Sequence, residues 1–325
     1  MKRLTKILPL LLVASLNACS QVTYQTDFSF YFDANFEISI YAKGNKAVKE
    51  IKRICQLIDN MADSHQKRDT FNVYDLNQTN ENVEVSYEFY SLLECAQLTS
   101  EKTDNFNILI GSLSNKWKEA LANKEVLSDT AIQEELNKIN NSSLSLSYRD
   151  DKYYAQRIGE AEIDLGGVAK GYALDRIYDY LINQNIDRYL INAGSSSVLL
   201  GSNYAKTWKG RPTDTFVVSL RDVPNTYIKA HHCVLSSSGN DIQGVEIDGV
   251  TYSHIVNPLT GKVVMENDAV IVMTPQGEGA LGDVLSTSLM MKNIDEIKAI
   301  EEKDNIKTIV VKDGKIAYSH PSIKM

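Results

Sequence analysis

The sequence predicts an α+β fold, because strand-like and helix-like segments are grouped along the chain. Short segments of alternating apolar and polar residues follow one another as in antiparallel hairpins, and amphipathic helical segments interrupt these runs. A parallel doubly wound sheet would instead need one helix after each strand. The 325 residues are 43% hydrophobic and 23% charged, as expected for a folded protein. No internal repeat or long low-complexity linker divides the chain, so one cooperative body is the simplest prediction.

The N-terminal half opens with a predicted strand at residues 35–42, NFEISIYA, in which apolar and polar residues alternate. Residues Ala47–Met61 then place apolar side chains at spacings of three and four, which predicts an amphipathic helix. The other elements predicted in this half are helices at about Val85–Leu98 and Asp129–Ile139 and strands at Leu144–Tyr148, Tyr153–Arg157 and Ala161–Asp164.

The C-terminal half is predicted to be richer in strands, with one helix at its start and two near its end. The predicted helices are Val168–Ile182, Gly279–Met291 and 295–302. The predicted strands are Tyr189–Asn192, Val198–Leu200, Phe216–Leu220, Tyr227–Ala230, Val234–Ser236, Val245–Ile247, Thr251–His254, Ala269–Met273, 307–311 and 315–319.

The N-terminus resembles a bacterial lipoprotein signal. Three basic residues precede the apolar run Ile7–Leu16, which is too short to span a bilayer as a helix. The run ends in Leu-Asn-Ala-Cys at residues 16–19, which resembles a lipobox. We therefore expect residues 1–18 to be removed and Cys19 to be lipidated, the alternative being an ordinary signal followed by an incidental cysteine. Several acyl chains would hold the protein stably on a bacterial membrane, outside the cytoplasm.

The expected mature chain is acidic, which limits its partners. Residues 19–27 are predicted to be a polar tether and residues 28–325 the folded domain. The full chain has 34 basic and 42 acidic residues, and removal of 1–18 takes away three positive charges, so the net charge changes from −8 to −11. Anionic lipid repels such a surface, so the lipid must provide the attachment. Nucleic-acid binding is not expected, because it needs a basic face.

The remaining cysteines, Cys55, Cys95 and Cys233, are odd in number, which favours buried thiols over a disulfide framework. The sequence also lacks H-E-x-x-H, C-x-x-C and G-x-S-x-G, so zincin, thioredoxin-like and α/β-hydrolase chemistries are not expected.

The segment Ile163–Tyr172, IDLGGVAKGY, passes from a predicted strand through paired glycines into the first turn of a helix. Such a turn lets the backbone approach a phosphate and present its free N–H groups, and Lys170 adds a cation. The spacing matches neither the Walker A pattern nor G-x-G-x-x-G. From the residues alone, a glycine turn that only serves strand-to-helix packing is an equally good interpretation.

Three further positions are candidates for chemistry. Asp283 and Thr287 are four apart on a predicted helix, so their side chains could share a hard cation such as Mg²⁺, although such pairs are usually solvated or capping. His254 ends a predicted strand before a Pro–Gly turn and is the best candidate for proton transfer, although a lone histidine is more often structural. His231 and His232 would point to opposite faces of a strand and so would not form a metal pair.

Taken in order, these segments resemble the FAD:protein FMN transferases of the ApbE family. DLGGVAKGYALD at 164–175 resembles the central motif of the family, SHIVNPLTG at 253–261 its H-I-(I/V)-D-P-x-T-G, and Asp283–Leu289 its D-x-x-x-T-x-L. Any one match could be chance, but the ordered set is specific and covers nearly the whole mature chain. Shorter matches occur at Tyr31–Asp33, Asn72–Asn77, Thr103–Trp117 and Ser237–Gly239.

The resemblance implies a fold of duplicated, T-fold-like α+β units and a Mg²⁺-dependent reaction. FAD would be split at its pyrophosphate, FMN would pass to a Thr or Ser hydroxyl of a protein carrying an S/T-G-A-T-like sequence, and AMP would leave. Asp283, Thr287 and the backbone carbonyl of Gly167 would hold the metal, and His254 would assist the transfer. The residues implied to line the FAD site are Phe32, His65, Asn105, Phe106, Asn107, Asp164, Lys170 and Val256.

The sequence departs from the family pattern at three places. No glycine follows Asp104, Asn257 replaces an aspartate, and N-x-G-G becomes Asn-Ala-Gly-Ser at 192–195. Asparagine removes charge but keeps hydrogen bonding, so FAD affinity or metal balance could differ while the site survives. Two alternatives therefore stay open: hydrolysis of FAD to FMN and AMP, and a lipid-anchored flavin-binding lipoprotein without turnover.

Overall fold

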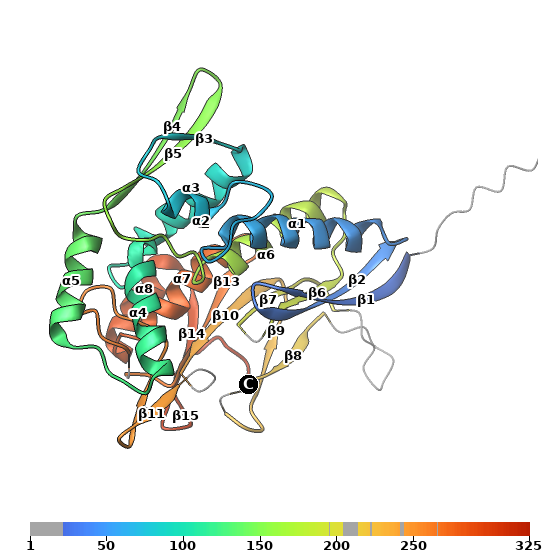
Figure 1. Ribbon diagram of the computed structural model, residues 1–325. Helices are drawn as coiled ribbons and strands as arrows, with labels where there is room; N and C mark the ends of the chain where they lie inside the picture. The colour runs from blue at the N-terminus through green and yellow to red at the C-terminus, as the bar shows by residue number, and fades with distance from the viewer. Residues whose placement is uncertain (1–21, 195, 204–213, 222, 241–243, 265) are drawn as a thin grey trace, which may run out of the picture.

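The core of the fold is an antiparallel sheet of eight strands in the order β1-β2-β6-β7-β10-β13-β14-β15 (Figure 1). A computed structural model of the chain describes residues 22–194, 196–203, 214–221, 223–240, 244–264 and 266–325. Every neighbouring pair in this sheet is antiparallel, which confirms the predicted α+β class. The strands are β1 (Val22–Tyr31), β2 (Ala34–Lys43), β6 (Tyr189–Ala193), β7 (Ser197–Leu200), β10 (Cys233–Gly239), β13 (Ala269–Pro275), β14 (Lys307–Lys312) and β15 (Lys315–Ser319).

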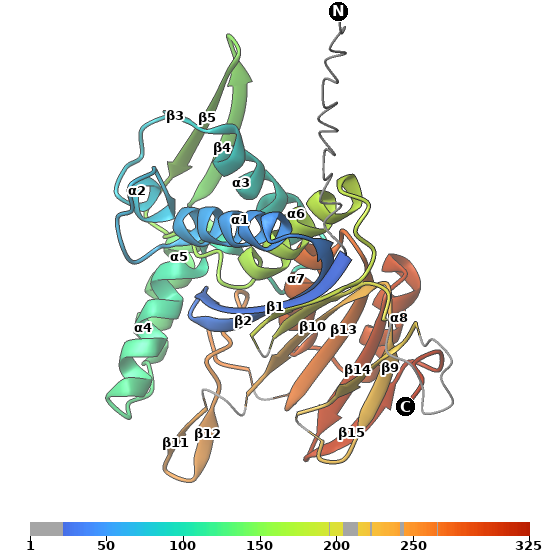
Figure 2. The same cartoon turned by 90° about the vertical axis from the view of Figure 1, so that its right-hand side faces the viewer.

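Helices cover one face of this sheet (Figure 2). α1 contacts β1 and β2, α6 contacts β6 and β7, α7 contacts β10 and β13, and α8 contacts β14. The four helices are α1 (Lys46–Ala62), α6 (Ala169–Asn183), α7 (Gly279–Leu289) and α8 (Ile294–Asp304). The apolar stripe predicted for α1 is its buried face, as an amphipathic helix on a sheet requires.

The opposite face is covered in part by a two-stranded ribbon, β8 (Phe216–Ser219) and β9 (Tyr227–Ala230). Strand β13 shows how both faces are used. Val270 and Val272 pack with residues of α7 and α8, whereas Ala269 and Ile271 pack with Ile228 of the ribbon. Successive side chains of a strand point to opposite faces, so β13 is buried on both faces of the sheet.

The remaining elements form a helical and β-ribbon region between residues 63 and 158 and a hairpin near residue 250. The ribbon of β4 and β5 projects from the body at the top of Figure 1. These elements are α2 (Val73–Asn77), β3 (Val83–Val85), α3 (Tyr87–Ser100), the 3₁₀ turn η1 (Ile108–Ile110), α4 (Gly111–Ala122), α5 (Asp129–Asn140), β4 (Ser143–Arg149), β5 (Lys152–Ile158), β11 (Val245–Ile247) and β12 (Val250–Tyr252).

Most predicted elements are confirmed within a few residues, but three differences matter. Residues 22–27, predicted to be part of a tether, belong to strand β1, which pairs with β2 along its whole length. Residues 161–164, predicted to be a strand, do not join a sheet, because side-chain and loop groups bond their backbone instead. The short helix α2 and helix α4 were not predicted. Within the described ranges, no helix has the length and apolar character needed to cross a membrane.

Candidate functional site

Helices α6 and α7 approach each other unusually closely, and two glycines allow it. A Cβ added to Gly171 would lie 2.1 Å from the carbonyl oxygen of Gly279, and one added to Gly279 would lie 2.6 Å from the carbonyl oxygen of Gly171. Both positions are therefore restricted to glycine by backbone contact and not by their own dihedral angles. This crossing brings the glycine turn before α6 against the buried face of α7.

Asp283 lies at the centre of this contact, with its side chain buried. Its carboxylate accepts hydrogen bonds from the backbone N–H of Gly171 at 2.6 Å and from the Ser197 hydroxyl at 2.6 Å. Burial raises the pKa of Asp283, and the Lys170 ammonium and the two donors act in the opposite direction. A buried carboxylate whose desolvation is only partly compensated is a suitable ligand for a cation.

The Gly167 carbonyl is made available by the same contact. The Gly171 N–H would pair with it in a regular α-helix, but it donates to Asp283 instead. Thr287 stands one turn after Asp283, and its Oγ1 is 3.1 Å from the Ser238 hydroxyl. A Cβ added to Gly167 would lie 3.9 Å from Thr287 Oγ1. Asp283, Thr287 and the backbone of Gly167 thus lie in one neighbourhood, and the oxygen donors that they offer are of the kind that suits Mg²⁺.

The entry to the glycine turn is fixed by backbone hydrogen bonds. Asn77, at the end of α2, accepts from the Ile163 N–H at 2.8 Å and donates to the Ile163 carbonyl at 2.9 Å. Next in sequence, the Asp164 N–H donates to the Ile108 carbonyl, and the Asp164 carboxylate accepts from the Gly166 N–H at 2.7 Å. The turn is therefore held in place before any ligand binds.

The predicted flavin-binding segment 105–107 lies against this turn. Thr103 and Ser288 of α7 are joined by a hydrogen bond of 2.7 Å, which fixes the segment to the helix that carries Asp283 and Thr287. Phe106 packs on Gly167, since a Cβ on that glycine would lie 2.7 Å from its ring. Asn105, by contrast, is buried and donates to the Met291 sulfur, and Asn107 caps the turn η1 through the Leu109 N–H.

His254 lies just beyond β12, and its Nδ1 is buried without a hydrogen-bond partner among the described residues. Burial, and then the positive charges of Lys118 and Lys170, lower the pKa of His254, so the imidazole is neutral at neutral pH. The following turn is fixed by Asn257, whose side-chain oxygen accepts from two backbone N–H groups, at 2.8 and 3.2 Å. Asparagine thus preserves the hydrogen bonds that an aspartate would make here.

Comparison with known proteins shows which family the chain belongs to. A sequence profile described as the ApbE family matches residues 32–310. The chain belongs to the ApbE family. It is 28% identical to a protein named FAD:protein FMN transferase from Klebsiella pneumoniae (strain 342), over 74% of each chain, and 24% identical to one from Vibrio cholerae, over 85% of this chain and 83% of the other.

The fold also matches solved ApbE structures. The ApbE protein of Thermotoga maritima superposes with a TM-score of 0.77 at 24% sequence identity, covering 92% of this chain and 97% of the other. The flavin transferase ApbE of Vibrio cholerae gives a TM-score of 0.71 at 21% identity, covering 93% and 98%. The family model and these structures together account for nearly the whole described body.

Three residues that the sequence predicted to contact FAD, Phe32, His65 and Val256, lie apart from Asp283 and Thr287. Among the described residues, no hydrogen bond or ring contact connects them to that pair. The Phe32 N–H donates to Asp59, and its ring lies tilted against that of Phe36, with the ring centres 5.8 Å apart. His65 is exposed on the loop after α1. Val256 is buried and pairs with Val263 across the turn.

Sequence reasoning missed residues that support the site. Asp175 of α6 accepts from the N–H groups of Gly279 and Ala280, at 2.6 and 2.9 Å, and so caps α7 from outside. Asp175 is the last residue of the 164–175 motif, and Asn77 is the last residue of the 72–77 match. The sequence therefore contained both residues in recognised motifs, but it did not indicate what either one does. Ser197, which begins β7, donates to the Asp283 carboxylate, and no pattern in the sequence indicated this role.

Proposed function

We propose that this ApbE family member is an FAD:protein FMN transferase that moves FMN from FAD to a Thr or Ser hydroxyl of a target protein and releases AMP. The observation that carries the proposal is the convergence of Asp283, Thr287 and the Gly167 carbonyl at a glycine turn that can approach a phosphate. The relatives that carry the name FAD:protein FMN transferase support the same reaction.

The donor set supports a requirement for Mg²⁺, bound by Asp283, Thr287 and the Gly167 carbonyl. When bound, the ion would screen the pyrophosphate and stabilise the charge on the leaving phosphate. In the reaction, a bond forms between the acceptor oxygen and the FMN phosphorus, and the bond from that phosphorus to the AMP oxygen breaks. The hydroxyl proton must leave the acceptor as this happens.

Two side chains suit the remaining steps. The positive charge of Lys170 lowers the pKa of both Asp283 and His254, so its ammonium lies near both groups, and we propose that it binds a phosphate oxygen. His254 is neutral and so can accept the hydroxyl proton. A protonated imidazole could not accept this proton. The burial of His254 keeps the imidazole neutral and so suits it to act as the base.

The flavin would lie over the glycine turn, near Phe106 and Asp164. The ring of Phe106 is already placed against Gly167, and aromatic side chains stack well on planar rings. Phe32, His65 and Val256 are proposed as more distant contacts to the flavin or adenine. Asn105 and Asn107 are proposed to act by shaping the segment that carries Phe106, because their side chains bond to the protein itself.

The decisive experiment is incubation of the protein with FAD, Mg²⁺ and an acceptor that carries an S/T-G-A-T-like sequence, followed by mass spectrometry of the acceptor and measurement of AMP. Transfer gives an acceptor that has gained one FMN, with one AMP released for each. AMP at the same rate without any acceptor would indicate FAD hydrolysis. Tight FAD retention with no AMP would indicate a flavin-binding lipoprotein.

We further propose that residues 1–18 are a lipoprotein signal peptide and that lipid on Cys19 attaches the protein to a bacterial membrane, outside the cytoplasm. The lipobox at 16–19 supports this, although these residues lie outside the described ranges. Strand β1 begins three residues after Cys19, and its Phe28 and Phe30 are 71% and 63% exposed on the same face. Aromatic side chains favour the membrane interface.

Detergent phase partitioning of the wild-type protein and Cys19→Ala in a bacterial host tests the anchor. The wild-type protein should enter the detergent phase, and the variant should stay in the aqueous phase. Equal partitioning of the two would contradict lipidation at Cys19.

A further inference from the structure

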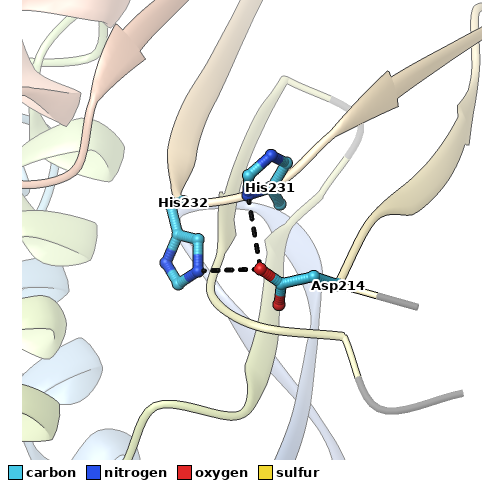
Figure 3. Close-up of side chains that lie close together, drawn as sticks. All are labelled: Asp214, His231 and His232. Carbon is cyan, nitrogen blue, oxygen red and sulfur yellow. Dashed lines mark ion pairs between the residues drawn. The ribbon is translucent and has the colours of Figure 1, made fainter. Parts of the chain in front are cut away.

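A second cluster of metal-binding side chains lies on the surface, away from the proposed transfer site. Asp214, His231 and His232 converge beside the turn between β9 and β10 (Figure 3). Asp214 Oδ2 is 3.8 Å from His231 Nδ1 and 3.5 Å from His232 Nε2. The expectation that the two histidines diverge was wrong, because they lie in a turn and His232 has a left-handed backbone, with φ of 48°.

The cluster is assembled from three chain segments by backbone hydrogen bonds. The His232 N–H donates to the Gly201 carbonyl at 3.4 Å, and the Asn203 N–H donates to the Asp214 carbonyl at 3.3 Å. The Ser202 hydroxyl is 3.1 Å from His232 Nε2. Residues 201–203 therefore connect the backbone positions of Asp214 and His232, so the three ligand groups are brought together before a metal binds.

The spacing and chemistry of these groups suit zinc. Ligands that are about 2.0–2.2 Å from a tetrahedral zinc ion are about 3.3–3.5 Å from one another. The two separations from Asp214 are at or slightly above this range, and all three ligand atoms lie within 4.8 Å of one another. Rotation of the exposed side chains would bring them to the tetrahedral spacing. Two imidazoles with one carboxylate favour Zn²⁺ and its neighbours in the first transition row over Mg²⁺.

We propose that Asp214, His231 and His232 form a binding site for Zn²⁺ or a similar late transition-metal ion. All three side chains are about half exposed, so water would complete the tetrahedron. In the bound state, the lone pair of His232 Nε2 faces the ion and its hydrogen bond with Ser202 is given up. The ion would join the β9–β10 turn to the segment that leads into β8.

This site is separate from the proposed magnesium site. Strand β10 starts directly after His232, and its Ser238 bonds to Thr287. Six residues of extended chain span about 20 Å, so the two sites lie at opposite ends of one strand. The first offers imidazole nitrogens, and the second only oxygens, so each should select a different class of metal.

The proposal is tested by calorimetric titration of untagged, chelator-treated full chain with Zn²⁺ in the presence of excess Mg²⁺, with Co²⁺ absorption as a measure of geometry. We expect one equivalent of Zn²⁺ to bind and Co²⁺ to give a tetrahedral spectrum. The variants His231→Ala, His232→Ala and Asp214→Asn should each weaken binding by at least about tenfold. His320→Ala, outside the cluster, is the matched control and should bind like the wild-type protein.

Three results would overturn the site. These are no Zn²⁺ binding to the wild-type chain, unchanged binding in both histidine variants, and loss of Zn²⁺ binding in Asp283→Asn with the surface histidines intact. The last result would mean that zinc occupies the proposed magnesium site. Because the measurement is of binding alone, it does not depend on whether the chain transfers FMN.

Discussion

The crossing of α6 and α7 makes a prediction that contradicts simple helix propensity. In an exposed helix, Gly→Ala stabilises by about 1 kcal/mol. In Gly171→Ala, however, the new Cβ would meet the Gly279 carbonyl oxygen at 2.1 Å and its carbon at 2.4 Å. Restoring ordinary contact, which begins at 3.4 Å, requires the helices to separate by about 1.3 Å. That movement would break the 2.6 Å bond from the Gly171 N–H to Asp283.

Overpacking and the loss of this charged hydrogen bond outweigh the propensity gain, so we expect Gly171→Ala to be destabilised by about 2–5 kcal/mol. Misplacement of Asp283 by about 1 Å should also reduce flavin transfer by about 100-fold. Gly166→Ala is the matched control for stability, because its Cβ would meet only the flexible Asp164 side chain, at 3.0 Å. Urea unfolding followed by circular dichroism measures both variants. A Gly171→Ala protein as stable as the wild type would refute the proposed helix contact.

Three further predictions concern polar groups of the site. Asp283→Asn keeps the shape of the side chain but removes its charge, and the variant should stay folded at neutral pH. In-gel flavin fluorescence of the acceptor should fall by about 100-fold or more. Transfer at the wild-type rate would disprove the metal assignment. Burial raises the pKa of Asp175 to about 7, above its unfolded value, so this group makes the protein less stable as pH rises from about 4 to 7, by about 4 kcal/mol in total. In Asp175→Asn, urea unfolding across that range should lose this part of the pH dependence, and an unchanged slope would show that the carboxyl does not titrate there. Asn77→Ala should leave the buried N–H and C=O of Ile163 unpaired, which should lower the free energy of unfolding in urea by about 2–4 kcal/mol. The variant should also bind FAD more weakly, as measured by fluorescence. Unchanged FAD affinity would mean that Asn77 does not position the glycine turn.

The sequence was most informative where one local pattern determines one structure. The apolar stripe of α1 and the alternation in β2 correspond directly to buried faces, because the helix and strand periods act on each residue separately. Strand β1 was missed because it is an edge strand with mixed polar residues and only one partner. Its pairing with β2 comes from tertiary contact and not from a hydrophobic pattern.

For the site, the ordered motifs identified Gly167, Asp283 and Thr287, and the structure brings these three together. The sequence could not predict that the Gly171 N–H donates to the carboxylate of Asp283, 112 residues away, and not to the carbonyl four residues earlier in its helix. Nor could it predict that Ser197 would bond the same carboxylate. Such contacts depend on how two helices cross, which is determined by packing across the whole sheet.

The most direct test of the proposed function is the intact mass of an acceptor protein after incubation with this protein, FAD and Mg²⁺. The proposed function predicts that the acceptor gains the mass of one FMN less water, that one AMP appears for each modified acceptor, and that Asp283→Asn gives neither. An acceptor of unchanged mass, whether or not AMP is released, would contradict FMN transfer to that acceptor.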